Sequence, residues 1–451
     1  MKQDLDFQYA GVGKLFVRQL IPALLGMISS ALYVVVDGIF IGQGIGSDGI
    51  AAVNIINPLM TIVSGIGLMF GMGGGVLASV NLSRGKKINA HINLMHAIIA
   101  AVGVGIILTV VLLLYPHEAG YLLGADESLI EDVAEYLRWY VICFPFMLLM
   151  TTLPFFVRLS NPNIPMWALA TGAVLNVVLD WLFIFPFGWG LAGAAAATSI
   201  GQTVGALIMI VYLFRPGLAV RLTRIRRSEV SKKSSLFLLK NMIYMVYLGF
   251  SVFLSEITIS IMVIAGNYAF MDVLGANGVA AFSIVCYLFP VIFMVFNATI
   301  QSAQPIISYN YGCCQIGRSQ QALRYALYFA IGFALLMVGV FLIGSEQVVK
   351  LFIPDTTNPA WKYAVDGLPW FAADFVFFGI NTIMIGYYMS LERLHKALLL
   401  TVVRGILPVI YFVILPLWIG HIGLWIAVAI ADITTTLLIG MMNLWTKLRI
   451  R

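Results

Sequence analysis

A polar pair interrupts one apolar stretch of the sequence. Residues 173–185 read AVLNVVLDWLFIF, in which only Asn176 and Asp180 are polar. Because they are four residues apart, both lie on one face of a helix, one turn from each other. A carboxylate facing hydrocarbon would cost about 3 kcal/mol. We therefore expect this face to point into a bundle of helices and to hold a charged or polar partner.

Other oxygen-bearing residues lie at the same predicted depth. Asp37, Asp180 and Thr198 fall about 6–11 Å below the outer ends of their apolar stretches, at roughly 1.5 Å per residue. Carboxylate, amide and hydroxyl oxygens suit Na⁺, and two close carboxylates can also carry a proton. These residues, with Asn176, predict a site for a cation, Na⁺ or H⁺. The alternative is that they only form hydrogen bonds between neighbouring helices.

The composition of the chain requires a bilayer. Of its 451 residues, 61% are hydrophobic and only 10% are charged, and the mean hydropathy is +0.97. Its long apolar runs predict an all-α integral membrane protein with twelve transmembrane helices. The polar start, MKQDLDFQYAGVGK, leads into a full-length span and predicts no cleavable signal peptide. The expected spans are 15–41, 49–82, 92–115, 130–157, 164–186, 191–214, 241–270, 277–309, 322–343, 363–390, 397–419 and 421–445.

The positions of Lys and Arg predict the orientation of these spans. Of the 26 such residues, only Lys350 and Lys362 fall in predicted outer loops, Arg138 and Arg404 fall deeper within spans, and the other 22 lie in cytoplasmic segments or at the cytoplasmic ends of spans. The positive-inside rule then places both termini in the cytoplasm of a multi-pass protein of the cell (inner) membrane. The basic stretch 215–235 is a cytoplasmic segment suited to anionic lipid. We expect no nucleic-acid partner.

An internal repeat divides the chain. GIAAVNI (49–55) matches GVAAFSI (278–284), and FPFGWGLAG (185–193) matches LPLWIGHIG (415–423) at nearly the same separation. The repeat predicts two six-helix lobes related by a pseudo-twofold axis along the membrane normal, as in many secondary transporters. The expected parts are an N-terminal lobe (1–214), a basic cytoplasmic linker (215–240) and a C-terminal lobe (241–451). The repeat does not copy the polar residues of the predicted cation site, which therefore belongs to the first lobe alone.

Three longer stretches resemble the multidrug and toxic compound extrusion (MATE) family of antiporters. They are YVVVDGIFIGQGIGSDGIAAVN (33–54), SNPNIPMWALATGAVLNVVLDWLFIFPFGWGLAGAAAATSIGQ (160–202) and AQPIISYNYG (303–312). The resemblance covers nearly the whole chain and implies a two-lobed exporter that expels organic cations in exchange for Na⁺ or H⁺. By motif match, it places coupling-cation residues at Asp37, Asn176, Asp180 and Thr198, with the carbonyl of Ala194. It also places the bending proline of the first helix at Pro22.

The second half contains three acids near mid-membrane: Glu256, Asp374 and Asp432. We expect Arg404 to neutralise Asp432, because a buried carboxylate with a basic partner is more often structural. Glu256 and Asp374 resemble the acids that some MATE branches use for cation coupling. They are therefore predicted to bind substrate or to act as a secondary coupling site, and which lobe couples stays open.

Other classes of function find less support. The sequence contains no GxxxxGK[ST], HExxH or GxSxG motif and no metal-spaced His cluster, so we expect neither an enzyme nor a bound cofactor. The four cysteines have no metal spacing and are predicted to be free thiols. The alternative function is a lipid-linked oligosaccharide flippase of the same superfamily, which would need arginines for its pyrophosphate. The expected partners of this chain are small organic cations and the bilayer, and it is predicted to act as a monomer.

Overall fold

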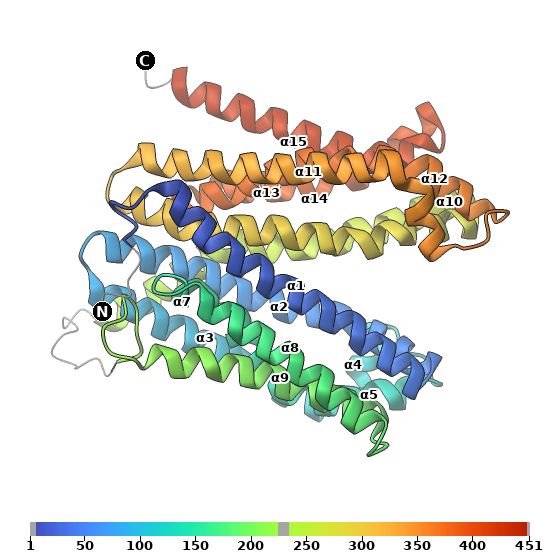
Figure 1. Ribbon diagram of the computed structural model, residues 1–451, viewed down its shortest axis with the longest axis horizontal. Helices are drawn as coiled ribbons and strands as arrows, with labels where there is room; N and C mark the ends of the chain where they lie inside the picture. Colours follow the sequence, from blue (N-terminus) through green and yellow to red (C-terminus); the bar gives the residue numbers. More distant parts are fainter. Residues whose placement is uncertain (1–5, 224–233, 449–451) are drawn as a thin grey trace. The chain divides into compact units, whose positions relative to one another are not determined.

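The computed structural model describes residues 6–223 and 234–448, and within these ranges every regular element is a helix (Figure 1). This agrees with the all-α membrane fold predicted from the apolar runs. Much of the predicted linker 215–240, namely residues 224–233, lies outside the described residues. All four cysteines are unpaired.

Contacts divide the chain into two compact units. Unit 1 comprises Met1–Phe253 with Pro305–Ser319, and unit 2 comprises Leu254–Gln304 with Gln320–Arg451. Two segments of the second half of the sequence therefore pack with the first half. The predicted lobes are defined by repeated sequence rather than by contacts, so their boundaries remain a prediction.

Unit 1 begins with long apolar helices joined by short turns. The fourth predicted span is broken by a 3₁₀ turn, η1, and the short helix α4 was not predicted. The elements are α1 (Val12–Gly44), α2 (Ser47–Ser83), α3 (Lys87–Leu114), α4 (Pro116–Leu123), α5 (Ile130–Tyr140), η1 (Val141–Cys143), α6 (Phe144–Thr152), α7 (Pro154–Val157), α8 (Asn163–Ile184) and α9 (Gly190–Leu213).

Helix α10 (Ser234–Gly312) covers the seventh and eighth predicted spans. A straight helix of its 79 residues would be about 120 Å long, several times the roughly 30 Å of a bilayer core. Gly275 breaks it with φ 66° and ψ −159°, a conformation that only glycine adopts without strain. The two predicted spans are therefore two helices that meet at this residue.

The remaining helices complete the predicted pattern. They are α11 (Ile316–Phe352), α12 (Pro359–Ala372), α13 (Asp374–Ser390), α14 (Leu394–Ile419) and α15 (Ile422–Leu448). In the described ranges, ten helices are long and apolar enough to cross a membrane, and the α12–α13 pair, bent by 41°, adds an eleventh span. Division of α10 at Gly275 accounts for the twelfth.

Candidate functional site

Helices α1, α8 and α9 form the frame of the candidate cation site in unit 1. Helix α8 packs along both α1 and α9, and Figure 1 shows α8 in green between the blue α1 and the yellow-green α9. Helices α8 and α9 approach most closely at two glycines: a Cβ atom on Gly201 would lie 2.7 Å from the carbonyl oxygen of Gly172 and 3.2 Å from the Cβ of Asn176. This close crossing brings the polar residues of α8 and α9 together.

The structure joins the predicted residues of these two helices. The Asn176 Nδ2 donates a hydrogen bond of 3.1 Å to the Thr198 Oγ1, and both side chains are buried. Ala194, fully buried, lies one turn before Thr198 on α9. The amide group of Asn176 is therefore oriented by Thr198, which leaves its Oδ1 without a donor.

Asp37 of α1 and Asp180 of α8 complete this cluster. Their carboxyl groups lie close enough to interact with each other directly. Asp180 is fully buried, and neither of its oxygens receives a hydrogen bond. The Oδ1 of Asp37 also lacks a donor. Two ionised carboxylates at this distance repel each other and have no proton to share, so the pair requires a positive charge between them.

These unsatisfied oxygen atoms fit a cation. Buried polar atoms are normally hydrogen-bonded, and here four acceptors from Asp37, Asn176 and Asp180 are not. Carboxylate and amide oxygens are ligands for hard cations such as Na⁺, and a proton would also neutralise the pair. The donor set thus suits either ion.

Further polar and aromatic side chains, which the sequence did not predict, lie around the candidate cation site. The Gln202 Nε2 donates a hydrogen bond of 3.2 Å to the Tyr33 hydroxyl. Tyr33 and Tyr136 both lie near Asp37 and Asp180. The position of Tyr33, one helical turn before Asp37, is a signal that could have identified it, whereas nothing in the sequence connects Tyr136 with this site.

Pro22 lies inside α1, which the structure shows as one continuous helix from Val12 to Gly44. A proline removes one backbone hydrogen bond and weakens the helix locally. The predicted bending at this residue stays a prediction.

The acids of the second half gather in unit 2 around one basic residue. The Arg404 Nε lies 3.4 Å from the Asp432 Oδ1, which confirms the predicted pair. Asn381 donates a hydrogen bond of 2.7 Å to the same oxygen, and the Arg404 guanidinium stacks 3.9 Å from the ring centre of Phe378. Asp432 thus has two partners, while the Arg404 Nη1 donates to the Thr382 hydroxyl and its Nη2 has no hydrogen-bond partner, so the pair is suited to a structural role.

The other two acids of this cluster are less well satisfied. Asp374 is fully buried, and neither of its oxygens receives a hydrogen bond, although it lies close to Asp432 and Arg404. Glu256 also interacts with Arg404. The cluster thus contains three carboxyl groups and one arginine, so it has more acidic than basic groups.

Asp432→Asn is expected to destabilise the protein by about 3 kcal/mol, because it leaves Arg404 in a buried position without its closest counter-charge. Thermal unfolding in detergent measures the change. The exposed Asp366 provides a control, since Asp366→Asn removes the same charge without a buried partner. An unchanged melting temperature for Asp432→Asn would show that the pair does not stabilise the fold.

The sequence matches a known family over most of its length. The family model MatE matches residues 22–182 and 251–414. This chain belongs to the MatE family. It is therefore one of the MATE transporters that the motifs indicated.

Individual relatives of this MATE protein are distant but cover nearly all of it. The multidrug export protein MepA of Staphylococcus saprophyticus is 24% identical over 90% of this chain and 88% of its own length. MepA of Staphylococcus aureus is 25% identical with the same coverage. A solved MOP superfamily transporter from Pyrococcus furiosus has a TM-score of 0.87 at 23% identity and covers 98% of this chain and 97% of that chain. The likeness confirms the two-lobed, twelve-helix fold.

Proposed function

We propose that this MATE protein is a cation-coupled antiporter that exports organic cations and drugs from the cytoplasm, with Na⁺ or H⁺ as the coupling ion and no other cofactor. The observation that carries the proposal is the group of four buried acceptor oxygens on Asp37, Asn176 and Asp180. A cation bound among these four oxygen atoms would be coordinated by all of them, and this supports the proposal that the site binds an ion.

Each residue of the site has a distinct role in this mechanism. Asp37 and Asp180 supply the negative charge that attracts the ion, and Thr198 orients the Asn176 amide so that its Oδ1 stays available. The carbonyl of Ala194 is a further ligand of the proposed set. An ion can drive export only if it binds the outward-facing and inward-facing states with different affinity. Asp37 is on α1 and the others are on α8 and α9, so a bend of α1 at Pro22 would separate the two carboxylates.

The proposed substrates follow from the second cluster and from the relatives. The MepA relatives are named multidrug export proteins. In unit 2, Glu256 and Asp374 share one arginine with Asp432, so a cationic substrate would supply the counter-charge that these carboxyl groups lack. The flippase alternative would need an intramembrane arginine free to bind pyrophosphate. Since Arg404 is paired with Asp432, this observation favours the exporter.

Reconstitution in liposomes tests the proposed function. The purified protein is placed in vesicles, and transport of a fluorescent organic cation is followed under a Na⁺ gradient or a pH gradient applied separately. We expect one gradient to drive uphill movement of the dye, which identifies the coupling ion. Absence of gradient-driven transport under both conditions, in protein that binds the dye, would refute cation coupling.

We also propose that both termini face the cytoplasm of the cell membrane. In a variant without native cysteines, Lys86→Cys in the α2–α3 turn should resist an impermeant thiol reagent in intact cells, while Glu127→Cys should react. Both positions are exposed, so the protein itself does not block either one. The opposite labelling pattern would invert the topology. We propose in addition that this MATE protein acts as a monomer.

A further inference from the structure

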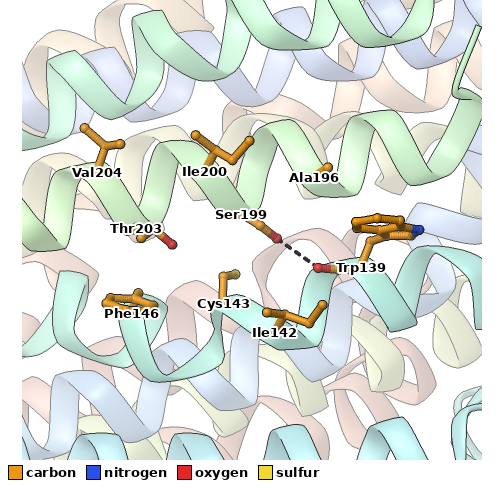
Figure 2. Close-up of a pocket in the computed structure, with 9 residues that line it drawn as sticks. All are labelled: Trp139, Ile142, Cys143, Phe146, Ala196, Ser199, Ile200, Thr203 and Val204. Carbon is orange, nitrogen blue, oxygen red and sulfur yellow. Dashed lines mark hydrogen bonds between the residues drawn. The ribbon is translucent and has the colours of Figure 1, made fainter. Parts of the chain in front are cut away.

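A groove in unit 1 has no part in the proposed mechanism. It lies between α9 and the segment α5–η1–α6, and it has a volume of about 380 Å³. Figure 2 shows Ile142, Cys143 and Phe146 on one wall facing Ile200 and Thr203 on the other. Apolar side chains dominate the lining, so the groove suits an apolar occupant.

The groove forms where the fourth span is broken. The 3₁₀ turn Val141–Cys143 interrupts the helix, and the carbonyl oxygen of Trp139 accepts a hydrogen bond of 3.2 Å from the Ser199 hydroxyl. The Cys143 thiol donates to the carbonyl oxygen of Tyr140 at 3.1 Å. These bonds occupy the Ser199 hydroxyl and the Cys143 thiol, and most of the remaining lining is apolar.

The surroundings of the groove identify what covers it. Both walls belong to candidate membrane spans, Ile130–Val157 and Gly190–Leu213. Its rim is exposed: Trp139 is 48%, Ile142 54% and Ile200 38% accessible. At this depth in a bilayer, an exposed apolar rim meets lipid chains and not water.

The position along α5 indicates which part of a lipid lies there. The first turns of α5 contain the exposed charged residues Glu131, Glu135 and Arg138, which belong at the level of the headgroups. Trp139 follows directly, as expected for an aromatic residue at the membrane interface. The groove thus begins just below the headgroups. Its volume of about 380 Å³ is large enough for part of one acyl chain.

We propose that this groove binds one acyl chain of a phospholipid, from the leaflet that meets the first turns of α5, as a retained structural lipid. The chain packs against residues that neighbour the candidate cation site. Ser199 lines the groove and is adjacent to Thr198. Cys143, which also lines the groove, donates to the carbonyl oxygen of Tyr140, whose ring centre lies 5.5 Å from that of Tyr136. A bound chain therefore supports the helices that position the acid pair.

Lipid retention tests this assignment. The wild type, purified in mild detergent, should keep one phospholipid in native mass spectrometry. Thr203→Trp fills the groove and should lower its occupancy about tenfold or more. Val211→Trp is the matched control, because Val211 is on the same helix, is 65% exposed and is not part of the groove lining. Equal retention by Thr203→Trp and wild type would overturn the proposal, as would a wild type without retained lipid.

A second measurement leaves the groove open. In a variant with the four native cysteines replaced by Ser and with Ile142→Cys, the exposed rim position 142 carries the one thiol that can react with a membrane-soluble maleimide. Dioleoyl phosphatidylcholine, added to delipidated protein, should slow this reaction, whereas glycerophosphocholine, which has no chains, should not. Protection by a cationic dye and not by the lipid would make the groove a substrate site and would refute the assignment. Neither readout depends on transport activity.

Discussion

Asp180→Asn is expected to abolish export against a gradient while the protein stays folded and inserted in the membrane. Asn preserves the shape of the side chain and its capacity for hydrogen bonds, but it removes the charge that holds a cation against Asp37. Coupling between two ligands of a protein typically amounts to about 5- to 150-fold in affinity, and this coupling should be lost. Dye export by proteoliposomes under the driving gradient measures the effect, and dye binding to the purified variant measures what remains.

Two further variants separate coupling from packing. Asp37→Asn should have the same phenotype, and the double variant should be no worse than either single one, because both residues act on one ion. Asp48→Asn serves as the control, since Asp48 is an exposed carboxylate near the same end of the first two helices. Near wild-type export by Asp180→Asn would refute the coupling role and would show that this carboxyl group contributes only to the packing of the helices.

The local part of this site could be predicted from the sequence. The spacing of Asn176 and Asp180 fixed their common helix face, and the estimate of depth placed Thr198 beside them, as their hydrogen bond confirms. Apolar helices in a membrane have nearly uniform geometry, so residue counts convert directly to depth. The pairing of Arg404 with Asp432 was also predicted, because a buried charge requires a partner.

Features that depend on packing or on backbone breaks were not predicted. Gln202 and Tyr136 reach the site because of how α5 and α9 cross, and hydropathy contains no information on helix crossing. The 3₁₀ turn at Val141–Cys143, and the groove beside it, follow from a local change of hydrogen-bond pattern that apolar side chains do not reveal. The short helix α4 was missed because it is too short to cross a bilayer.

Glu256→Gln is expected to weaken transport of cationic dyes about tenfold and to leave uncharged substrates nearly unaffected. Two unit charges about 5 Å apart attract each other by roughly 3 kcal/mol at an effective dielectric constant near 20. Loss of about half of that energy corresponds to a tenfold change. Because Arg404 also interacts with Asp432 and Asp374, the cluster should retain its fold without the Glu256 charge.

Paired dyes of similar size, one cationic and one neutral, measure this selectivity in the same proteoliposomes. Glu256→Asp retains the charge and should restore cationic transport in large part, while Glu346→Gln removes an exposed carboxylate and should change neither dye. Selective loss of the cationic dye would place Glu256 on the substrate side of the mechanism, separate from the ion held by Asp37 and Asp180. An equal loss for both dyes would instead assign Glu256 to the fold or to coupling in general, and the substrate role proposed for the second cluster would then be wrong.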